Sequence, residues 1–150
     1  MIEPVVSSVN VDGIDVVVES QGAGAESVLF VHGLGSNRGC WYRAKEFFDL
    51  QRFRLILPDL PGFGQSARPA DYDYSMAAFG DCLYRVILEC RVERLHIVAH
   101  SMGCAAALCM LETHKICPDS FVAAEGNLVA EDAFMSSKVA RLTESDFLRS

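Results

Sequence analysis

The sequence predicts an α/β fold with three α/β/α layers and a mostly parallel sheet that opens with an antiparallel hairpin. Short β-branched runs at residues 5–9 and 14–19 flank the segment 10–13, whose final Asp-Gly pair is typical of a tight hairpin turn. After this hairpin, short apolar runs alternate with stretches of helical periodicity. That alternation indicates repeated strand-helix-strand units with helices on both faces of the sheet.

Four further strands are expected in short apolar stretches. Residues 27–31 form a continuous apolar run of strand length, which is typical of a strand buried on both faces. Residues 53–57 and 95–99 are two further strands, and 121–124 is a sixth strand after a Pro-Asp turn. Functional sites in such sheets gather at the carboxyl ends of the strands, so the residues that follow these runs are of interest.

Helices are expected between the strands. Apolar residues between Trp41 and Phe48 recur at helical spacing, and Ser75 is a suitable N-cap for a helix with one apolar stripe from Met76 to Cys90. Residues 102–111 are nearly all small or apolar, which predicts a helix packed closely on the sheet.

Length and composition indicate one folded domain. The chain has 150 residues, of which 51% are hydrophobic and 22% charged, so disorder is excluded. The formal net charge of −7 has the wrong sign for a phosphate-binding surface, which argues against a nucleic-acid partner.

The sequence also predicts the cellular compartment of the protein. No window reaches the roughly 18 apolar residues that span a bilayer, and the amino terminus has neither the basic region nor the apolar core of an export signal. Six cysteines without a CxxC pair fit a reduced, cytoplasmic protein and give no metal site. We therefore expect a protein that needs neither membrane nor metal.

The segment AHSMG at residues 99–103 lies between a predicted strand and a predicted helix. A sharp strand-to-helix turn crowds the residues two before and two after a serine, and it lifts the serine hydroxyl clear of the sheet. The free N–H groups and the dipole of the helix amino terminus favour the negative charge that develops in acyl transfer. Ser101 is thus a candidate nucleophile and the Met102 amide a candidate oxyanion donor, whereas simple N-capping is the alternative role for Ser101.

Two earlier loops fit the same architecture. HGLG at residues 32–35 follows the third predicted strand, where Leu34 would supply the second oxyanion amide, and LPDLPGFGQS at 57–66 ends the fourth. With AHSMG, these motifs occur in an order that resembles the α/β-hydrolase superfamily, and the resemblance runs from about residue 5 to residue 127. It implies a serine hydrolase that acts on an ester-like or related carbonyl of a small-molecule substrate and uses no cofactor.

The resemblance also implies an acid after the sixth or seventh strand and a histidine after the eighth. Glu125, at the end of the predicted sixth strand, is the candidate acid, with a structural strand-end role as its alternative. None of the four histidines is well placed to accept the Ser101 proton; they are His32, His96, His100 and His114.

This missing base suggests an α/β-hydrolase fold that lacks its last strands. We expect residues 1–127 to form the core with strands one to six, and 128–150 to begin a cap or lid helix or, alternatively, a surface helix. The chain would then be the amino-terminal part of a longer hydrolase, with little activity on its own. Its sixth strand would be an exposed edge that invites self-association.

Other functions remain open at this point. A non-catalytic α/β-hydrolase-like binding module would keep the pocket without the base, and the carbon–carbon bond hydrolases and cofactor-free haloperoxidases share the same turn. A haloalkane dehalogenase is disfavoured because that chemistry uses a carboxylate nucleophile where this chain has Ser101.

Side chains beside the motifs are expected to support them. His32 and His100 should orient loops by hydrogen bonding, and Asp59 should bind the backbone of the turn that follows it. Trp41 and Phe63 either line an apolar pocket or pack in the core.

Overall fold

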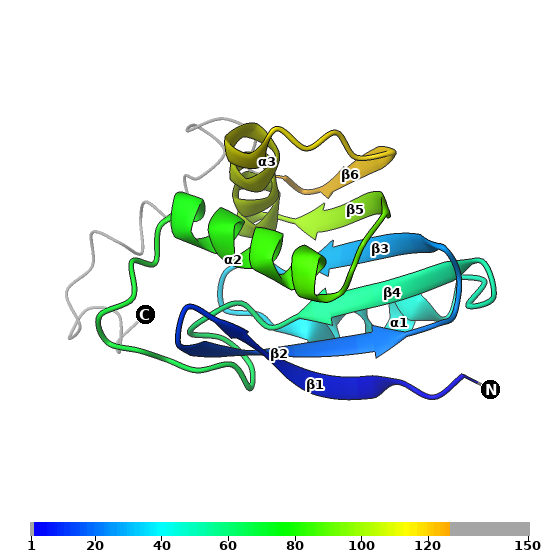
Figure 1. Cartoon of the computed structure of the whole chain (residues 1–150), viewed down its shortest axis with the longest axis horizontal. Coiled ribbons are helices and arrows are strands. Elements are labelled where there is room, and N and C mark those ends of the chain that lie inside the picture. Colours follow the sequence, from blue (N-terminus) through cyan, green and yellow to red (C-terminus); the bar gives the residue numbers. More distant parts are fainter. Residues whose placement is uncertain (1, 127–150) are drawn as a thin grey trace.

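In the computed structural model, residues 2–126 are described, and residues 1 and 127–150 lie outside the described part. Within residues 2–126 six strands form one sheet in the order β1-β2-β4-β3-β5-β6 (Figure 1). The strands are β1 (Val5–Val11), β2 (Ile14–Gln21), β3 (Glu26–Val31), β4 (Phe53–Pro58), β5 (Arg94–His100) and β6 (Ser120–Ala124). The expected start of a cap helix at 128–150 lies outside the described residues.

The amino-terminal hairpin forms as predicted, with strands slightly longer than expected. Val11 pairs with Ile14, and the turn residues Asp12 and Gly13 have φ values of 50° and 91°. A two-residue turn with positive φ at both positions matches the twist of the flanking strands, and glycine tolerates that conformation best. The side chain of Asn10 accepts a hydrogen bond from the Gly13 N–H at 3.1 Å and closes the turn.

The other half of the sheet is parallel. β3 pairs in parallel with both β4 and β5, and β6 extends the parallel part beyond β5. The carboxyl ends of these four strands therefore lie along one edge of the sheet. The motifs expected to carry the chemistry all follow those ends.

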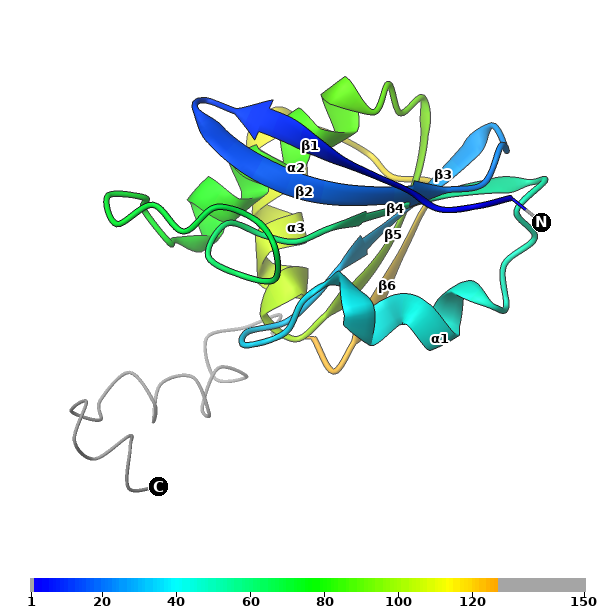
Figure 2. The ribbon, with the colours of Figure 1, turned by 90° about the horizontal axis from the view of Figure 1, so that it is seen from below.

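Helices cover both faces, which confirms the three-layer architecture. α2 (Met76–Glu89) and α3 (Met102–His114) pack together on one face, and the 3-10 helix η1 (Arg38–Trp41) with α1 (Tyr42–Lys45) lies on the other (Figures 1 and 2). Ser75 caps α2 as predicted, because its hydroxyl accepts a hydrogen bond from the Ala78 N–H at 3.2 Å.

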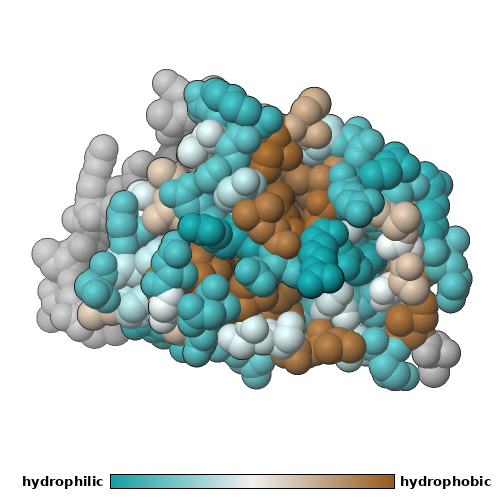
Figure 3. Space-filling model, viewed as in Figure 1, coloured by the Kyte–Doolittle hydropathy of each residue, from teal (hydrophilic) through white to brown (hydrophobic). Residues whose placement is uncertain are grey.

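The core is divided between the two faces of the sheet. The larger cluster joins the sheet to α2 and α3, and its fully buried members include Leu29, Ile97, Leu83 and Met110. In the space-filling view of this face, polar side chains dominate, and apolar ones gather between α3 and the strands β5 and β6 (Figure 3). No helix in this described part of the chain is long and apolar enough to cross a membrane.

The smaller cluster corrects the helix expected over Trp41 to Phe48. Only one turn of α-helix forms, and the chain then turns so that Phe48 packs edge-on against Phe30, with ring centroids 5.4 Å apart. Phe47, which belonged to the apparent apolar stripe, is 87% exposed. The periodicity was misleading because Trp41 and Phe48 reach the sheet from a short, irregular segment.

Charged residues join the amino ends of the parallel strands, opposite the motif-bearing edge. Glu26 of β3 contacts Arg52 Nε at 3.1 Å and His96 Nε2 at 2.9 Å. The hydrogen bond from Arg52, and next that from His96, lowers the pKa of the Glu26 carboxyl below its ordinary value. A carboxyl whose pKa is lower in the folded state binds fewer protons there than in the unfolded state, so it stabilises the fold at neutral pH.

We expect Glu26→Gln to reduce the free energy of unfolding at pH 7. The deficit should shrink as the pH falls from the ordinary carboxyl range through the lowered pKa of Glu26, because protonation then removes the same interactions from the wild type. Urea denaturation at several pH values measures this. Glu93→Gln, at an exposed position, is the control, and a deficit that is independent of pH in this range would contradict the assignment.

Candidate active site

Ser101 occupies the sharp turn between β5 and α3. Its backbone has φ 50° and ψ −121°, a conformation that side-chain-bearing residues rarely adopt, and its N–H donates to the Ala124 carbonyl of β6 at 3.1 Å. The Ser101 side chain makes no capping hydrogen bond to α3. A serine placed there to cap the helix would bond to the first-turn amides, so Ser101 is not a side-chain cap of α3. Its role as the nucleophile stays a prediction.

Gly103 explains why the turn needs a small residue after the serine. A Cβ at this position would lie 2.5 Å from the His32 carbonyl oxygen and 2.7 Å from that of Val31. Both atoms belong to the backbone and cannot move aside. The first turn of α3 is therefore pressed against the end of β3, where the HGLG loop begins.

The HGLG loop lies directly against the serine turn. A Cβ on Gly33 would be 3.2 Å from Ser101 Cβ and 2.8 Å from His100 Nδ1, so only glycine allows this approach. The structure thus brings Gly33 close to Ser101. That the Leu34 and Met102 amides form an oxyanion site stays a prediction. The side chain of Met102 is buried, whereas Leu34 is 52% exposed.

His32 is fully buried and joins two loops. Its Nδ1 lies 2.9 Å from the Gly33 carbonyl oxygen, and its Nε2 accepts a hydrogen bond from the Leu60 N–H at 3.0 Å. Burial lowers the pKa of the His32 ring, against smaller opposing effects of the Gly33 carbonyl and of Asp59. The ring is neutral at pH 7, and it orients the loops as the sequence predicted.

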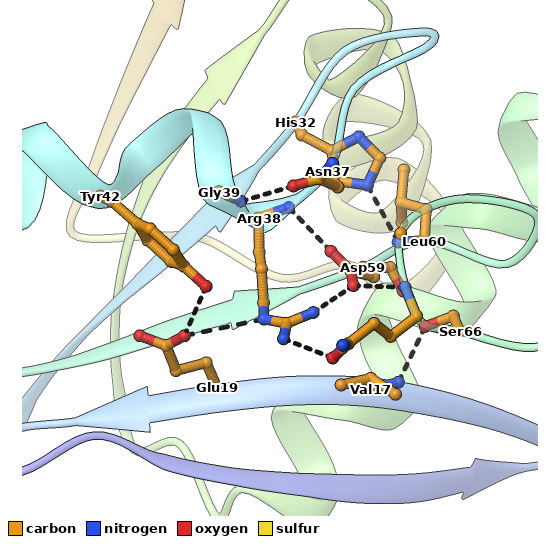
Figure 4. A network of polar contacts seen from close by, with 12 residues as sticks. Val17, Glu19, His32, Asn37, Arg38, Gly39, Tyr42, Asp59, Leu60 and Ser66 are labelled. Atoms are coloured by element: carbon orange, nitrogen blue, oxygen red, sulfur yellow. Dashed lines mark hydrogen bonds and ion pairs between the residues drawn. The ribbon is translucent and has the colours of Figure 1, made fainter.

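Asp59 anchors the loop that follows β4. One carboxylate oxygen accepts from the Arg38 N–H at 2.7 Å, and the other accepts from the Gln65 N–H at 2.8 Å (Figure 4). The Arg38 guanidinium pairs with the same carboxylate and donates to Gln65 Oε1 at 2.7 Å. The predicted bonding of Asp59 to the loop backbone is confirmed, but the buried arginine was not anticipated.

The ion pairs continue to β2. Glu19 is 3% exposed, pairs with Lys45, accepts from the Tyr42 hydroxyl at 3.1 Å and lies 3.6 Å from Arg38 Nε. Two carboxylates and two cations thus balance one another. Sequence reasoning missed this network because its members come from four segments with no fixed spacing.

A polar cleft of about 370 Å³ opens beside the network. Ser101 is not among its lining residues, which are Asn37, Arg38, Gly39, Tyr42, Asp59, Gly64 and Gln65. Trp41 and Phe63, the two candidate pocket residues, are partly buried and pack against the core: Trp41 on Phe30 at 5.3 Å between ring centroids, and Phe63 on His32 at 5.4 Å.

Glu125 directly follows β6 and is the neighbour of Ala124, whose carbonyl accepts the hydrogen bond from Ser101. Its side chain is 89% exposed, and its Oε2 lies 3.6 Å from His100 Nε2. The structure therefore brings Glu125 to His100 and shows no hydrogen bond between Glu125 and Ser101. Its role as the catalytic acid stays a prediction.

The remaining histidines are engaged elsewhere. His96 lies at the opposite sheet edge between Glu26 and the Ser120 hydroxyl, and His114 bonds to Asp81 at 2.8 Å. Neither has a hydrogen bond to Ser101 in the described part of the chain.

The strand order and the sharp turn at Ser101 are those of the α/β-hydrolase fold. A sequence model of the alpha/beta hydrolase fold family matches residues 26–140, and the chain belongs to this family.

Particular relatives agree with that assignment. The chain is 35% identical over 115 residues to the probable lysophospholipase BODYGUARD 4 of Arabidopsis thaliana, a match that covers 75% of this chain and 26% of that protein. Among solved structures, it resembles an esterase of Exiguobacterium antarcticum (26% identity, TM-score 0.72), covering 79% of this chain and 44% of that one. An alpha/beta hydrolase fold protein of Burkholderia ambifaria, at 24% identity and TM-score 0.76, matches in fold over 83% of this chain and 45% of that chain. The chain thus spans about a quarter of the length of this curated relative.

We expect Asp59→Asn to destabilise the protein by about 3–5 kcal/mol, because it leaves the buried Arg38 guanidinium without its main counter-charge. Chemical denaturation measures the loss. Asp71→Asn, at an exposed position, changes the net charge by the same amount and should have little effect. Equal effects of the two substitutions would contradict a structural role for the ion pair.

Gly103→Ala should destabilise the protein even though alanine is the better helix former by about 1 kcal/mol. The added methyl meets two backbone carbonyls, and overpacking of this kind costs about 1–3 kcal/mol. Thermal unfolding gives the comparison, and Ala105→Gly on the same helix measures the propensity effect alone. A Gly103→Ala variant as stable as the wild type would show that α3 does not press on β3.

Proposed function

We propose that this protein is a serine hydrolase that cleaves carboxylic esters, with Ser101 as the nucleophile. The observation that carries the proposal is the backbone of Ser101, whose φ of 50° and ψ of −121° place a serine without a capping hydrogen bond at the amino terminus of α3. Non-glycine residues keep such a conformation only where the surrounding structure enforces it, and such positions cluster at active sites.

In the proposed reaction, Ser101 Oγ attacks the carbonyl carbon of the ester and its proton passes to a general base. The oxygen of the tetrahedral intermediate is held by the Met102 N–H, at the helix end where the dipole favours negative charge, and by the Leu34 N–H. The alcohol leaves with the proton. Water then cleaves the acyl-serine ester, which releases the acid and restores Ser101.

The general base of the proposed reaction is not assigned to a residue of this chain. All four histidines of the chain lie within the described residues. Three of them, His32, His96 and His114, form hydrogen bonds to groups other than Ser101. The relatives are longer than this chain and carry further residues that it lacks. Glu125, at the edge of the sheet where Ser101 lies, is the proposed partner of that base.

The relatives support esters as the substrate class. One is named a probable lysophospholipase and another an esterase, and both names refer to ester cleavage. An epoxide hydrolase of Vigna radiata also shares the fold, at 24% identity, which indicates the fold alone.

The proposal is tested by covalent labelling of the full-length protein encoded by the gene with a fluorophosphonate probe. We expect labelling at Ser101, detected by mass spectrometry of the modified peptide, and its loss in Ser101→Ala. Removing the hydroxyl removes the attacking atom, so no residual labelling of this peptide is expected. Ser8→Ala, an exposed serine of β1, is the matched control and should label like the wild type.

Failure of the folded full-length protein to react would overturn the hydrolase assignment. It would favour the non-catalytic binding module, which keeps the fold without the chemistry.

A further inference from the structure

His32 contacts one of the two peptide groups on which the proposed oxyanion site depends. The Gly33 carbonyl and the Leu34 N–H belong to the same peptide group, and no peptide bond in the described residues is cis. A planar trans peptide directs its C=O and its N–H to opposite sides. Whatever fixes the Gly33 carbonyl therefore also fixes the direction of the Leu34 N–H.

The Gly33 carbonyl oxygen is held from two sides. His32 Nδ1 lies 2.9 Å away, and the Ser36 N–H donates to the same oxygen at 3.3 Å, the longer of the two contacts. Glycine at position 33 adds no side chain that would restrict rotation of this peptide. The His32 ring is thus the main restraint on the peptide orientation.

The partner on the far side of the ring determines which nitrogen carries the proton. The Leu60 N–H donates to His32 Nε2 at 3.0 Å, so Nε2 must be the bare nitrogen. In a neutral ring the proton then sits on Nδ1 and points at the Gly33 carbonyl. Because the ring is fully buried and packs edge-on against Phe63, it cannot rotate to exchange these roles.

We propose that His32 is a positioning residue for catalysis: its Nδ1–H holds the Gly33 carbonyl and thereby aims the Leu34 N–H away from the ring, into the oxyanion site beside Ser101. The inference rests on the proposed serine chemistry. It assigns His32 no contact with substrate and no proton transfer in the reaction.

Two substitutions separate this role from that of a simple link between loops. Asn places its amide nitrogen where Nδ1 lies, so His32→Asn keeps the donor to Gly33 and loses the acceptor for Leu60. Gln places its amide oxygen where Nε2 lies, so His32→Gln keeps the acceptor for Leu60 and loses the donor. Each variant thus preserves one of the two hydrogen bonds.

The experiment measures the rate of Ser101 labelling by the fluorophosphonate, and kcat and KM with p-nitrophenyl butyrate, in the full-length protein. Deleting an oxyanion donor costs on the order of 10²–10³ in rate, so a donor that is released but still present should cost roughly tenfold in His32→Gln. His32→Asn should stay within about threefold of the wild type. The loss should fall on kcat with KM little changed, because the oxyanion forms only in the transition state.

Opposite ranking of the variants, or equal rates for both, would overturn the inference. Circular dichroism tests whether each variant is folded. Should either fail to fold, the ¹⁵N resonances of the wild-type imidazole decide the matter: a protonated Nδ1 with a bare Nε2 is expected, and a proton on Nε2 overturns the proposal. If the wild type is labelled at Ser101 but the two variants do not show the expected order of rates, only the role of His32 is contradicted. If the wild type is not labelled at all, the proposed function itself is contradicted.

Discussion

The buried carboxylate of Asp59 is the constraint on which the arrangement of the site depends. A charge with no exposure to solvent must be paired and hydrogen-bonded, since the desolvation penalty is otherwise several kcal/mol. Asp59 meets that requirement with partners from two segments, Arg38 after the HGLG loop and Gln65 in the loop after β4. A Cβ on Gly64 would lie 2.1 Å from the carboxylate, so the loop can wrap around it only with glycine at that position. The two loops consequently form one unit.

The strained serine turn is held by the strands on either side of it. A residue such as Ser101, kept in a sparsely populated backbone conformation, costs about 1–3 kcal/mol and persists only when its surroundings leave no alternative. The Ala124 carbonyl of β6 fixes its N–H from one side, and Gly33 and Gly103 let the backbone of β3 and its loop approach from the other. The strain is thus supported by β6 on one side of the turn and by β3 with its loop on the other.

Local chemistry made much of the fold predictable from the sequence. The Asp-Gly turn, the cap at Ser75 and the small residues of α3 each depend on residues close in the sequence. Their effect on the structure can therefore be predicted from the order of residues alone. The segment after Trp41 misled because its apolar residues are held by the sheet and not by a helix. Glu19 and Arg38 gave no signal, since strands and loops from distant parts of the chain bring them together. The serine turn was predictable because it needs small residues at fixed spacing around Ser101. Its chemistry stays a prediction, since no histidine in the described residues is hydrogen-bonded to Ser101.

The charge balance of the network also explains how His32 stays neutral close to a carboxylate. Attraction to Asp59 favours the protonated ring, and burial opposes it; burial is the larger effect, so the pKa of His32 is lowered. The Arg38 guanidinium, paired with the same carboxylate, offsets its negative charge and so reduces the attraction that His32 experiences. Protonation at Nε2 would set an N–H against the Leu60 N–H and remove the bond between the loops. The buried ion pair thus contributes in two ways: it joins the loops directly, and it preserves the neutral ring that joins them a second time.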